Sequence, residues 1–156
     1  NPVPPEMDEI NMNDVIRNAC NEVQGLLADS DKISIVNDCD KPIKGIATEL
    51  NSLCTNLISN AVRYSPDGAD IEISWASLSD SKARLSVKDT GIGIAKEHID
   101  RITERFYRVD MKDSRARGGT GLGLAIVKHV LRRHNSELEV KSRVNEGSLF
   151  YCDFEL

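Results

Sequence analysis

Hydrophobic residues recur at helical spacing in three stretches of the chain. In the first, Asn13 is placed to cap a helix. Apolar side chains three or four residues apart then give this helix one face: Val15, Ile16, Ala19, Cys20, Val23, Leu26 and Leu27. The second stretch runs from Thr48 to Tyr64 and ends at Ser65-Pro66-Asp67-Gly68. The third begins after Gly121, with Leu122, Ile126 and Val130 in phase. Three helices are therefore predicted.

Elsewhere the period changes to two, which is typical of strands with one buried face. Ile71, Ile73 and Trp75 alternate with polar residues, as do Leu85 and Val87, so they predict a hairpin. Shorter strand candidates are Ile33 to Val36, Ile43 to Ala47, Leu138 to Val140, and Phe150 to Leu156, the last two flanking a turn at Asn145 to Gly147. Grouped helices and hairpins favour an α+β sandwich, a mixed sheet with helices on one face.

One connection is unusual. A short helix is expected near Glu97 to Ile102, and the polar, arginine-rich run from Arg105 to Gly119 follows it without an apolar period. A structureless connection of that length is typical of a mobile loop or of a loop that a ligand orders.

The composition of the chain excludes several classes of protein. The chain has 156 residues, of which 40% are hydrophobic and 29% charged, which suits one domain with a packed core. Its net charge of -5 argues against nucleic acid as a partner, so any affinity for phosphate must be local. The four cysteines lack zinc spacing and are expected to be buried, reduced thiols. No apolar run reaches the roughly 20 residues that cross a bilayer.

The first ten residues hold Pro2, Pro4 and Pro5. We expect residues 1–10 to be a linker from a neighbouring domain upstream of this chain, and residues 11–156 to be the folded domain.

A polar stripe runs along the second predicted helix, because Glu49, Ser52, Asn56, Asn60 and Arg63 lie three or four residues apart. A solvated helix face is one interpretation. The stripe is narrow and rich in amides, however, and Asn56 and Asn60 are one turn apart. Their carbonyl oxygens could therefore meet a hard cation such as Mg²⁺.

Asp89-Thr90-Gly91-Ile92-Gly93 directly follows the strand that contains Leu85 and Val87. An ordinary turn at a strand end is one interpretation. The other is a nucleotide site in which Asp89 accepts a hydrogen bond from the exocyclic amine of adenine. Such a carboxylate rejects guanine, whose carbonyl oxygen would face another acceptor.

A glycine-rich run, Gly118 to Leu124, opens the third helix. Free backbone N–H groups and the positive end of the helix dipole make such a place an anion site. The run is neither a Rossmann fingerprint nor a P-loop, since no buried strand precedes it and no Gly-Lys-Ser/Thr follows. The bordering residues Phe106, Tyr107, Arg108, Arg115 and Arg117 form either an exposed charged loop or a lid over a nucleotide.

The order of these segments resembles the N, G1, F and G2 boxes of sensor histidine kinases. The four segments are Asn56-Leu-Ile-Ser-Asn60-Ala-Val-Arg-Tyr-Ser-Pro, Asp89-Thr-Gly-Ile-Gly93, Glu104-Arg-Phe-Tyr-Arg-Val-Asp110 and Gly119-Thr-Gly-Leu-Gly-Leu-Ala-Ile-Val-Lys128. The resemblance extends from about Asn11 to Leu156, and from Arg105 to Lys128 it is nearest to the sensor kinases of phosphate regulons. It implies the Bergerat ATP-binding fold of the GHKL superfamily, an α+β sandwich with a mixed sheet of about five strands, three helices on one face and an ATP lid.

The resemblance also implies roles for single residues. Asn60 would hold Mg²⁺, and the catalytic set would be Asn56, Asn60, Arg63 and Arg108. The ATP-binding set would add a side chain beside the nucleotide, the adenine pocket, the lid and the phosphate cradle: Tyr64, Asp89, Gly91, Gly93, Ile94, Arg105, Phe106, Gly119, Thr120, Gly121, Leu122, Gly123 and Ser148.

The activity implied is transfer of the γ-phosphate of ATP to a histidine on a separate dimerisation domain, with a response regulator as the further partner. ATPases of the same fold carry a glutamate where this chain has Asn56, and a neutral amide cannot deprotonate water. A nucleotide-binding regulatory module and an ATP hydrolase are the alternatives. His98 is followed by Ile99-Asp100-Arg101 and so lacks the acidic residue and the proline that come after the histidine of the family's phosphoacceptor box. The acceptor is therefore expected outside the chain. The resemblance further implies that the chain would be the cytoplasmic domain of a membrane-anchored bacterial sensor.

Overall fold

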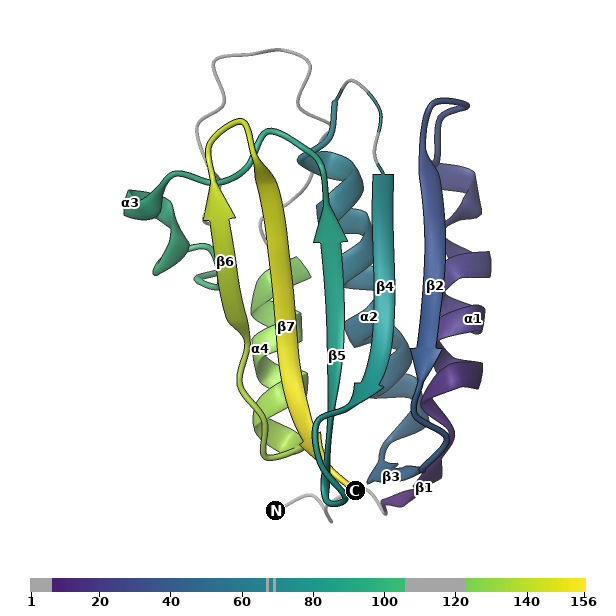
Figure 1. Cartoon of the computed structure of the whole chain (residues 1–156). Helices are drawn as coiled ribbons and strands as arrows, with labels where there is room; N and C mark the ends of the chain where they lie inside the picture. The colour runs from purple at the N-terminus through teal and green to yellow at the C-terminus, as the bar shows by residue number, and fades with distance from the viewer. Residues whose placement is uncertain (1–6, 67, 69, 106–122) are drawn as a thin grey trace.

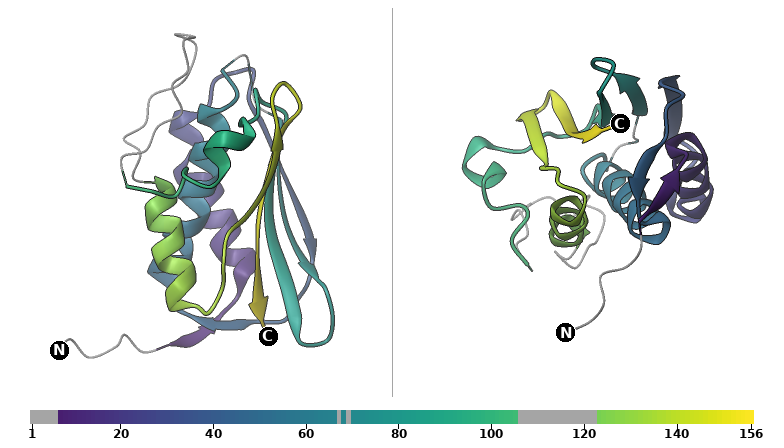
Figure 2. Two further views of the ribbon diagram at one scale, coloured as in Figure 1. Left: turned by 90° about the vertical axis from the view of Figure 1, so that its left-hand side faces the viewer. Right: turned by 90° about the horizontal axis from the view of Figure 1, so that it is seen from below.

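The computed structural model describes residues 7–66, 68, 70–105 and 123–156, which form a mixed sheet covered on one face by helices (Figures 1 and 2). The five strands lie in the order β2-β4-β5-β7-β6. Their bounds are Lys32–Asp38 (β2), Asp70–Ser77 (β4), Lys82–Asp89 (β5), Glu139–Arg143 (β6) and Gly147–Glu155 (β7). β2 is parallel to β4, and the other neighbours are antiparallel. The predicted α+β architecture with a mixed five-stranded sheet is confirmed.

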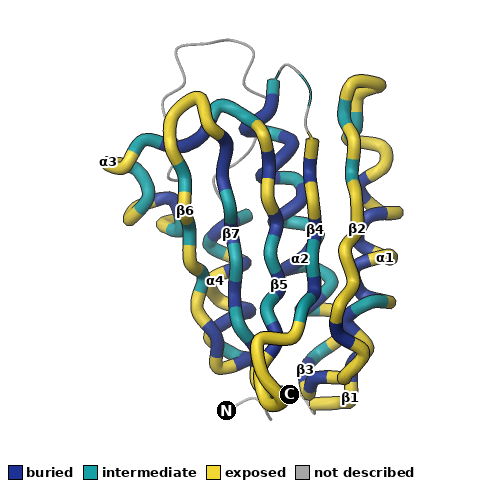
Figure 3. Tube along the Cα trace, viewed as in Figure 1, coloured by how far each residue is buried: buried dark blue, intermediate teal, exposed yellow. Residues whose placement is uncertain are grey.

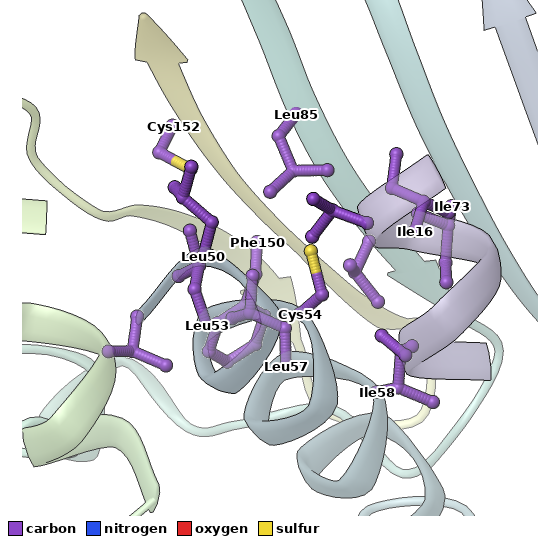
Figure 4. Close-up of a cluster of buried hydrophobic side chains, with 14 of the residues drawn as sticks. Ile16, Leu50, Leu53, Cys54, Leu57, Ile58, Ile73, Leu85, Phe150 and Cys152 are labelled. Carbon is purple, nitrogen blue, oxygen red and sulfur yellow. The ribbon is translucent and has the colours of Figure 1, made fainter. Parts of the chain in front are cut away.

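Three helices form the second layer: α1 (Met12–Glu22), α2 (Ala47–Arg63) and α4 (Gly123–Arg133). The core lies between them and the sheet, where Leu53 and Leu57 of α2 approach Phe150 of β7 (Figure 4). α2 is the central helix and packs against both α1 and α4. Its apolar face is therefore buried against the sheet while its flanks meet other helices.

The beginning of the fold differs from the sequence prediction. Asn11, not Asn13, caps α1, because the Asn11 side chain accepts the backbone N–H of Asn13 at 3.0 Å. Asn13 instead donates its side-chain amide to the carbonyl of Cys39. The predicted helical face also ends early, since a short 3₁₀ turn, η1 (Gln24–Leu26), follows α1 and leaves Leu26 59% exposed.

A second, two-stranded sheet lies below the main one in Figure 1. β1 (Asp8–Ile10) pairs antiparallel with β3 (Ile43–Gly45), and Ile10 is buried opposite Ile43. The last three residues of the predicted linker are thus part of the folded unit. A linker function for the residues before them stays a prediction.

On the face of the sheet that lacks helices, polar side chains of neighbouring strands contact one another. Arg84 donates two hydrogen bonds to Asp153, of 2.7 and 3.1 Å, and lies over the Tyr151 ring. Ser74 and Ser86 are joined by a hydrogen bond of 2.6 Å between their hydroxyls. Figure 3 shows that nearly all residues of the edge strand β2 are exposed.

Three findings concern the cysteines, metal clusters and apolar helices of the described part of the chain. The four cysteines are buried and form no disulfide. Within the described ranges, no three His, Cys, Asp or Glu residues gather as a metal cluster, and no helix has the length and apolarity to span a bilayer.

Candidate functional site

The described parts of the predicted site segments lie toward one end of the molecule, the upper end in Figure 1. The chain reaches this end at the C-terminus of α2, at the C-terminus of β5 and at the turn between β6 and β7. The first turn of α4 lies beside the middle of α2. Residues that are up to about a hundred positions apart in the sequence therefore share one region.

Asp89 is the last residue of β5 and is only 3% exposed. Burial raises the pKa of its carboxyl to about 6, although hydrogen bonds from the backbone N–H groups of Gly91 and Ser148 act in the opposite direction. The bond from Gly91 to Oδ1 measures 2.9 Å. The carboxyl group at the end of this strand is therefore almost inaccessible to water. A ligand that donates a hydrogen bond to it would be favoured over a ligand that does not.

The turn after Asp89 is fixed by close backbone contacts. The Ile92 N–H donates to the carbonyl of Tyr64 at 2.8 Å, and a Cβ on Gly91 would lie 2.0 Å from that carbonyl oxygen. Gly93 has φ of +73°, and its Cβ would lie 1.9 Å from the carbonyl of Arg143. Both glycines are therefore required by the approach of neighbouring protein backbone, and the turn joins α2 to the β6–β7 hairpin.

The polar stripe of α2 is not a solvated face. None of its five members is exposed, and Asn60 is 4% exposed. Glu49 accepts a hydrogen bond of 2.9 Å from Arg133 of α4. The amide of Asn56 donates to the carbonyl of Ser52 at 2.7 Å, and its Oδ1 lies 2.9 Å from the position a Cβ of Gly123 would take. The stripe therefore faces α4 and the glycine that opens it.

Asn60 and Arg63 are in direct contact. The Arg63 guanidinium donates a hydrogen bond of 2.8 Å to Oδ1 of Asn60 and lies 5.3 Å from the centre of the Tyr64 ring. Tyr64 itself is 3% exposed. Asn56 and Asn60 thus present their oxygens to different partners, Gly123 and Arg63, instead of to one shared point.

The sequence interpretation missed a hydroxyl network beside Asp89. Ser142 of β6 accepts the N–H of Ile94 at 2.7 Å, and its hydroxyl lies 2.9 Å from the Gly147 carbonyl and 2.6 Å from the Ser148 hydroxyl. This hydrogen bond fixes the backbone of Ile94, whose residue is 1% exposed. A signal was available, because Ser142 is in phase with Val140 and so faces the helices.

A cavity of about 500 Å³ lies at this end of the sheet. Asp89, Ser142 and Ser148 line it together with the apolar side chains of Ile99, Val140 and Leu149. Charged residues also line it, namely Lys88, Lys141, Arg143 and Glu146.

Several predicted site residues lie outside the described part of the chain. These are Phe106 and Arg108 of the expected lid, and Gly119, Thr120, Gly121 and Leu122 of the expected phosphate cradle. Arg105, the last residue described before this gap, is exposed. Their assignment to a lid and a cradle stays a prediction.

The sandwich and the arrangement of this site define the class of ATP-binding domains with a mixed sheet under three helices. Residues 45–156 match the family model described as histidine kinase-, DNA gyrase B-, and HSP90-like ATPase. The chain belongs to this family, and the resemblance found in the sequence is confirmed.

Within the family, the most similar proteins include sensor kinases. The phosphate regulon sensor protein PhoR of Pseudomonas aeruginosa is 53% identical over 112 residues, which is 72% of this chain and 25% of that protein. The sensor-like histidine kinase SenX3 of Mycolicibacterium smegmatis is 40% identical over 148 residues, 94% of this chain and 38% of that protein. The chain thus spans between a quarter and two fifths of these relatives.

Solved structures share the fold. The mycobacterial sensor histidine kinase MprB superposes with a TM-score of 0.83 at 24% identity, over 96% of this chain and 97% of that one. The catalytic domain of the histidine kinase ThkA gives a TM-score of 0.78 at 22% identity, over 97% and 98%. The Bergerat-type sandwich predicted from the sequence is therefore confirmed at the level of the fold.

Proposed function

We propose that this chain is the ATP-binding catalytic domain of a two-component sensor kinase that transfers the γ-phosphoryl group of ATP to a histidine on a separate dimerisation domain. The relative SenX3 is named as a sensor-like histidine kinase and PhoR as a phosphate regulon sensor protein, which supports this activity for the whole protein. Full-length ShkA, a structure on which the chain superposes with a TM-score of 0.82 at 21% identity, was solved in complex with AMPPNP. An adenine nucleotide is thus the ligand to test first.

The adenine ring would enter the cavity beside Asp89, and its exocyclic amine would donate to the Asp89 carboxylate. The low exposure of this carboxyl supports the role, because an acceptor that water cannot reach favours a ligand that brings a donor. Gly91 and Gly93 would act by holding the turn against Tyr64 and Arg143, which sets the position of Asp89. Ile94 and Ser148 would form the adjoining wall.

The phosphates would lie along α2, toward the first turn of α4. Arg63 supplies a cation there, and Gly123 brings the helix N-terminus next to Asn56. The lid residues Arg105, Phe106 and Arg108 and the cradle from Gly119 to Leu122 would close over the phosphates.

Mg²⁺ would be held through the Asn60 oxygen, with water and phosphate oxygens as its other ligands. The fit is reasonable because Asn60 is 4% exposed and faces the phosphate region through its contact with Arg63. A bound magnesium ion would neutralise charge on the transferring phosphoryl group. Arg63 must then leave Oδ1 of Asn60, since one amide oxygen that served both cations would bring two positive charges together.

Asn56 is the observation that favours transfer to histidine over hydrolysis of ATP. Its side chain stands between Ser52 and Gly123, at the place where the resemblance puts a glutamate in the ATPases of this fold. A carboxylate there could deprotonate water, whereas the Asn56 amide cannot. An imidazole nitrogen carries its own lone pair, so it would attack the γ-phosphorus without first being deprotonated. ADP would leave, and the ring would then lose its remaining N–H proton to solvent.

The test is a transfer assay with the two domains supplied separately. The chain is mixed with a purified dimerisation domain of its own kinase and γ-labelled ATP, and acid-labile label on histidine is measured. Label on the acceptor, lost when its histidine is replaced by glutamine, is the expected result. Tight ATP binding without label would favour a regulatory module, and free phosphate released by the chain alone would favour a hydrolase.

The further partner would be a response regulator, to which the phosphohistidine would pass its phosphoryl group. The chain would be the cytoplasmic part of a membrane-anchored bacterial sensor, as its resemblance to phosphate-regulon sensor kinases suggests.

A further inference from the structure

We infer that Ser142 is a specificity-determining positioning residue: it fixes the Ser148 hydroxyl as a hydrogen-bond acceptor, so that the nucleotide cavity selects a base with an amine at position 6. The inference rests on the proposed nucleotide function and names how the cavity would tell adenine from a 6-oxopurine. It is carried by the three contacts of the Ser142 hydroxyl.

Counting protons decides which way these contacts point. A serine hydroxyl has one proton and two lone pairs. Ser142 Oγ lies 2.7 Å from the Ile94 nitrogen, 2.9 Å from the Gly147 carbonyl oxygen and 2.6 Å from Ser148 Oγ. The Ile94 N–H can only donate and the Gly147 carbonyl can only accept.

One arrangement satisfies all three contacts. Ser142 accepts from Ile94, donates its proton to Gly147 and accepts the proton of Ser148. If Ser142 donated to Ser148 instead, its oxygen would face the Gly147 carbonyl oxygen at 2.9 Å without a proton between them. Because buried polar groups lose free energy when unpaired, the first arrangement is favoured.

The consequence is that Ser148 has no proton left for the cavity. Its hydroxyl oxygen, on a residue that is 4% exposed, presents lone pairs only. Ser148 is the register partner of Asp89 across β5 and β7, and Asp89 and Ser148 line the same cavity. When Asp89 is ionised, the cavity therefore offers two acceptors side by side.

Two neighbouring acceptors suit the amine of adenine and oppose the carbonyl oxygen of hypoxanthine or guanine. Asp89 alone gives part of this selection. Without Ser142, the Ser148 hydroxyl could rotate and donate its proton to a carbonyl oxygen, so a 6-oxopurine would be tolerated better. Ser142 would thus act on the base through Ser148 without touching the nucleotide.

The experiment compares the dissociation constants of ADP and IDP, which differ at position 6 and lack a transferable γ-phosphoryl group. Both are measured by calorimetry on the wild-type chain and on Ser142→Ala. We expect the preference for ADP over IDP to fall about tenfold in the variant, the equivalent of one hydrogen bond exchanged for a repulsive contact. A role in folding alone would weaken both nucleotides equally, so an unchanged preference would overturn the inference.

Three further variants fix the interpretation. Ser142→Thr keeps the hydroxyl and should keep the preference for ADP over IDP. When Ser142→Ala is added to Ser148→Ala, the double variant should show the same preference as Ser148→Ala alone. A further loss in that background would mean that Ser142 does not act through Ser148. Ser86→Ala is the matched control, because it breaks the same kind of serine pair, of 2.6 Å with Ser74, on the face without helices.

Failure of the inference and failure of the proposed function give different results. If the wild-type chain binds neither nucleotide, the proposed function is wrong. If it binds ADP in preference to IDP and Ser142→Ala changes nothing, only the inference is wrong. If Ser142→Ala does not fold, Ser148→Ala alone must lower the preference, and a full preference in that variant would contradict the role of the pair.

Discussion

Oδ1 of Asn60, the atom expected to bind magnesium, accepts a hydrogen bond of 2.8 Å from Arg63 one turn further along α2. The arginine thus keeps the buried amide paired when no metal is present. Under the proposed function, loading of Mg²⁺-nucleotide would exchange one cation for another at the same oxygen, and Arg63 would become available to the phosphates.

We predict that Asn60→Ala removes the magnesium-dependent part of nucleotide affinity. ATP should bind about tenfold more weakly in the presence of Mg²⁺, as expected for loss of a hydrogen bond or ligand to a charged group, and with nearly unchanged affinity in EDTA. Fluorescence titration with a labelled nucleotide provides the measurement. Asn51→Ala is the matched control, because the Asn51 amide on the same helix faces Glu22. Full enhancement by Mg²⁺ in the Asn60 variant would contradict the assignment.

The raised pKa of Asp89 predicts a pH dependence of stability. The pKa is about 6 in the folded chain against an ordinary value of 3.8, because burial disfavours the charged form. The folded state therefore binds the proton more tightly, and this contribution is complete below about pH 4 and lost as pH rises through 6. Relative to Asp89→Asn, the wild-type free energy of unfolding should fall by on the order of 2 kcal/mol between pH 4 and 7. Urea denaturation at several pH values measures it, and parallel curves for the two chains would refute the shift.

The same group predicts the opposite trend for nucleotide binding. Adenine needs the ionised carboxylate as an acceptor, so a proton on Asp89 competes with the ligand. ATP affinity should fall toward tenfold per unit as pH drops below about 6. Asp89→Asn should bind ATP weakly and with little dependence on pH in this range. Calorimetry from pH 5 to 8 tests both chains, and equal affinities for them at pH 8 would exclude Asp89 from the adenine contact.

The turn glycines can be tested by their effect on folding. Gly91→Ala places a methyl group 2.0 Å from the carbonyl oxygen of Tyr64, a backbone atom that cannot move without displacing the end of α2. We expect the free energy of unfolding of this variant to fall by about 3 kcal/mol or more, or the variant not to fold. Gly25→Ala is the control, since nothing lies within 4 Å of its added Cβ, and its stability should change by less than about 0.5 kcal/mol. Similar melting curves for the two variants would show that the turn is not so closely packed.

His134 joins the end of α4 to the start of α2. Its Nε2 accepts the backbone N–H of Ile46, the residue that caps α2, at 3.1 Å, and Nδ1 lies 2.8 Å from the Val130 carbonyl. This arrangement requires the neutral ring with its proton on Nδ1. His134→Ala should cost about 1–3 kcal/mol by leaving the Ile46 N–H unpaired, whereas exposed His129→Ala should cost little. Nitrogen-15 NMR of the ring tests the tautomer directly, and a proton on Nε2 would contradict it.

The periodic patterns predicted the main elements because burial is what creates them. The alternation of Ile71, Ile73 and Trp75 became β4, and the second apolar period became α2 within one residue of its predicted limits. Local chemistry was predicted less well at the start of the chain. The sequence places two asparagines near the start of α1, and the choice of Asn11 over Asn13 depends on contacts with Cys39 that no local pattern contains.

In the candidate site too, periodicity predicted some features, and others depend on side-chain rotamers or on contacts between residues far apart in the sequence. Spacing along α2 placed Asn56, Asn60 and Arg63 on one face, and the structure brings that face against α4. The pairing of Asn60 with Arg63, by contrast, is a choice between rotamers that spacing cannot make. Ser142 was missed because its role comes from a strand register that places it beside Ser148 and from a turn that brings Ile94 to it.

The central claim is that the chain binds Mg²⁺-ATP at this site, and the most direct measurement is the melting curve of the wild-type chain with increasing ATP, with and without Mg²⁺. At a ligand concentration 100 times the dissociation constant, the nucleotide should add about 2.7 kcal/mol to the free energy of unfolding. The gain should depend on Mg²⁺ and be reduced in Asp89→Asn. A melting temperature that stays unchanged at millimolar Mg²⁺-ATP would contradict the account.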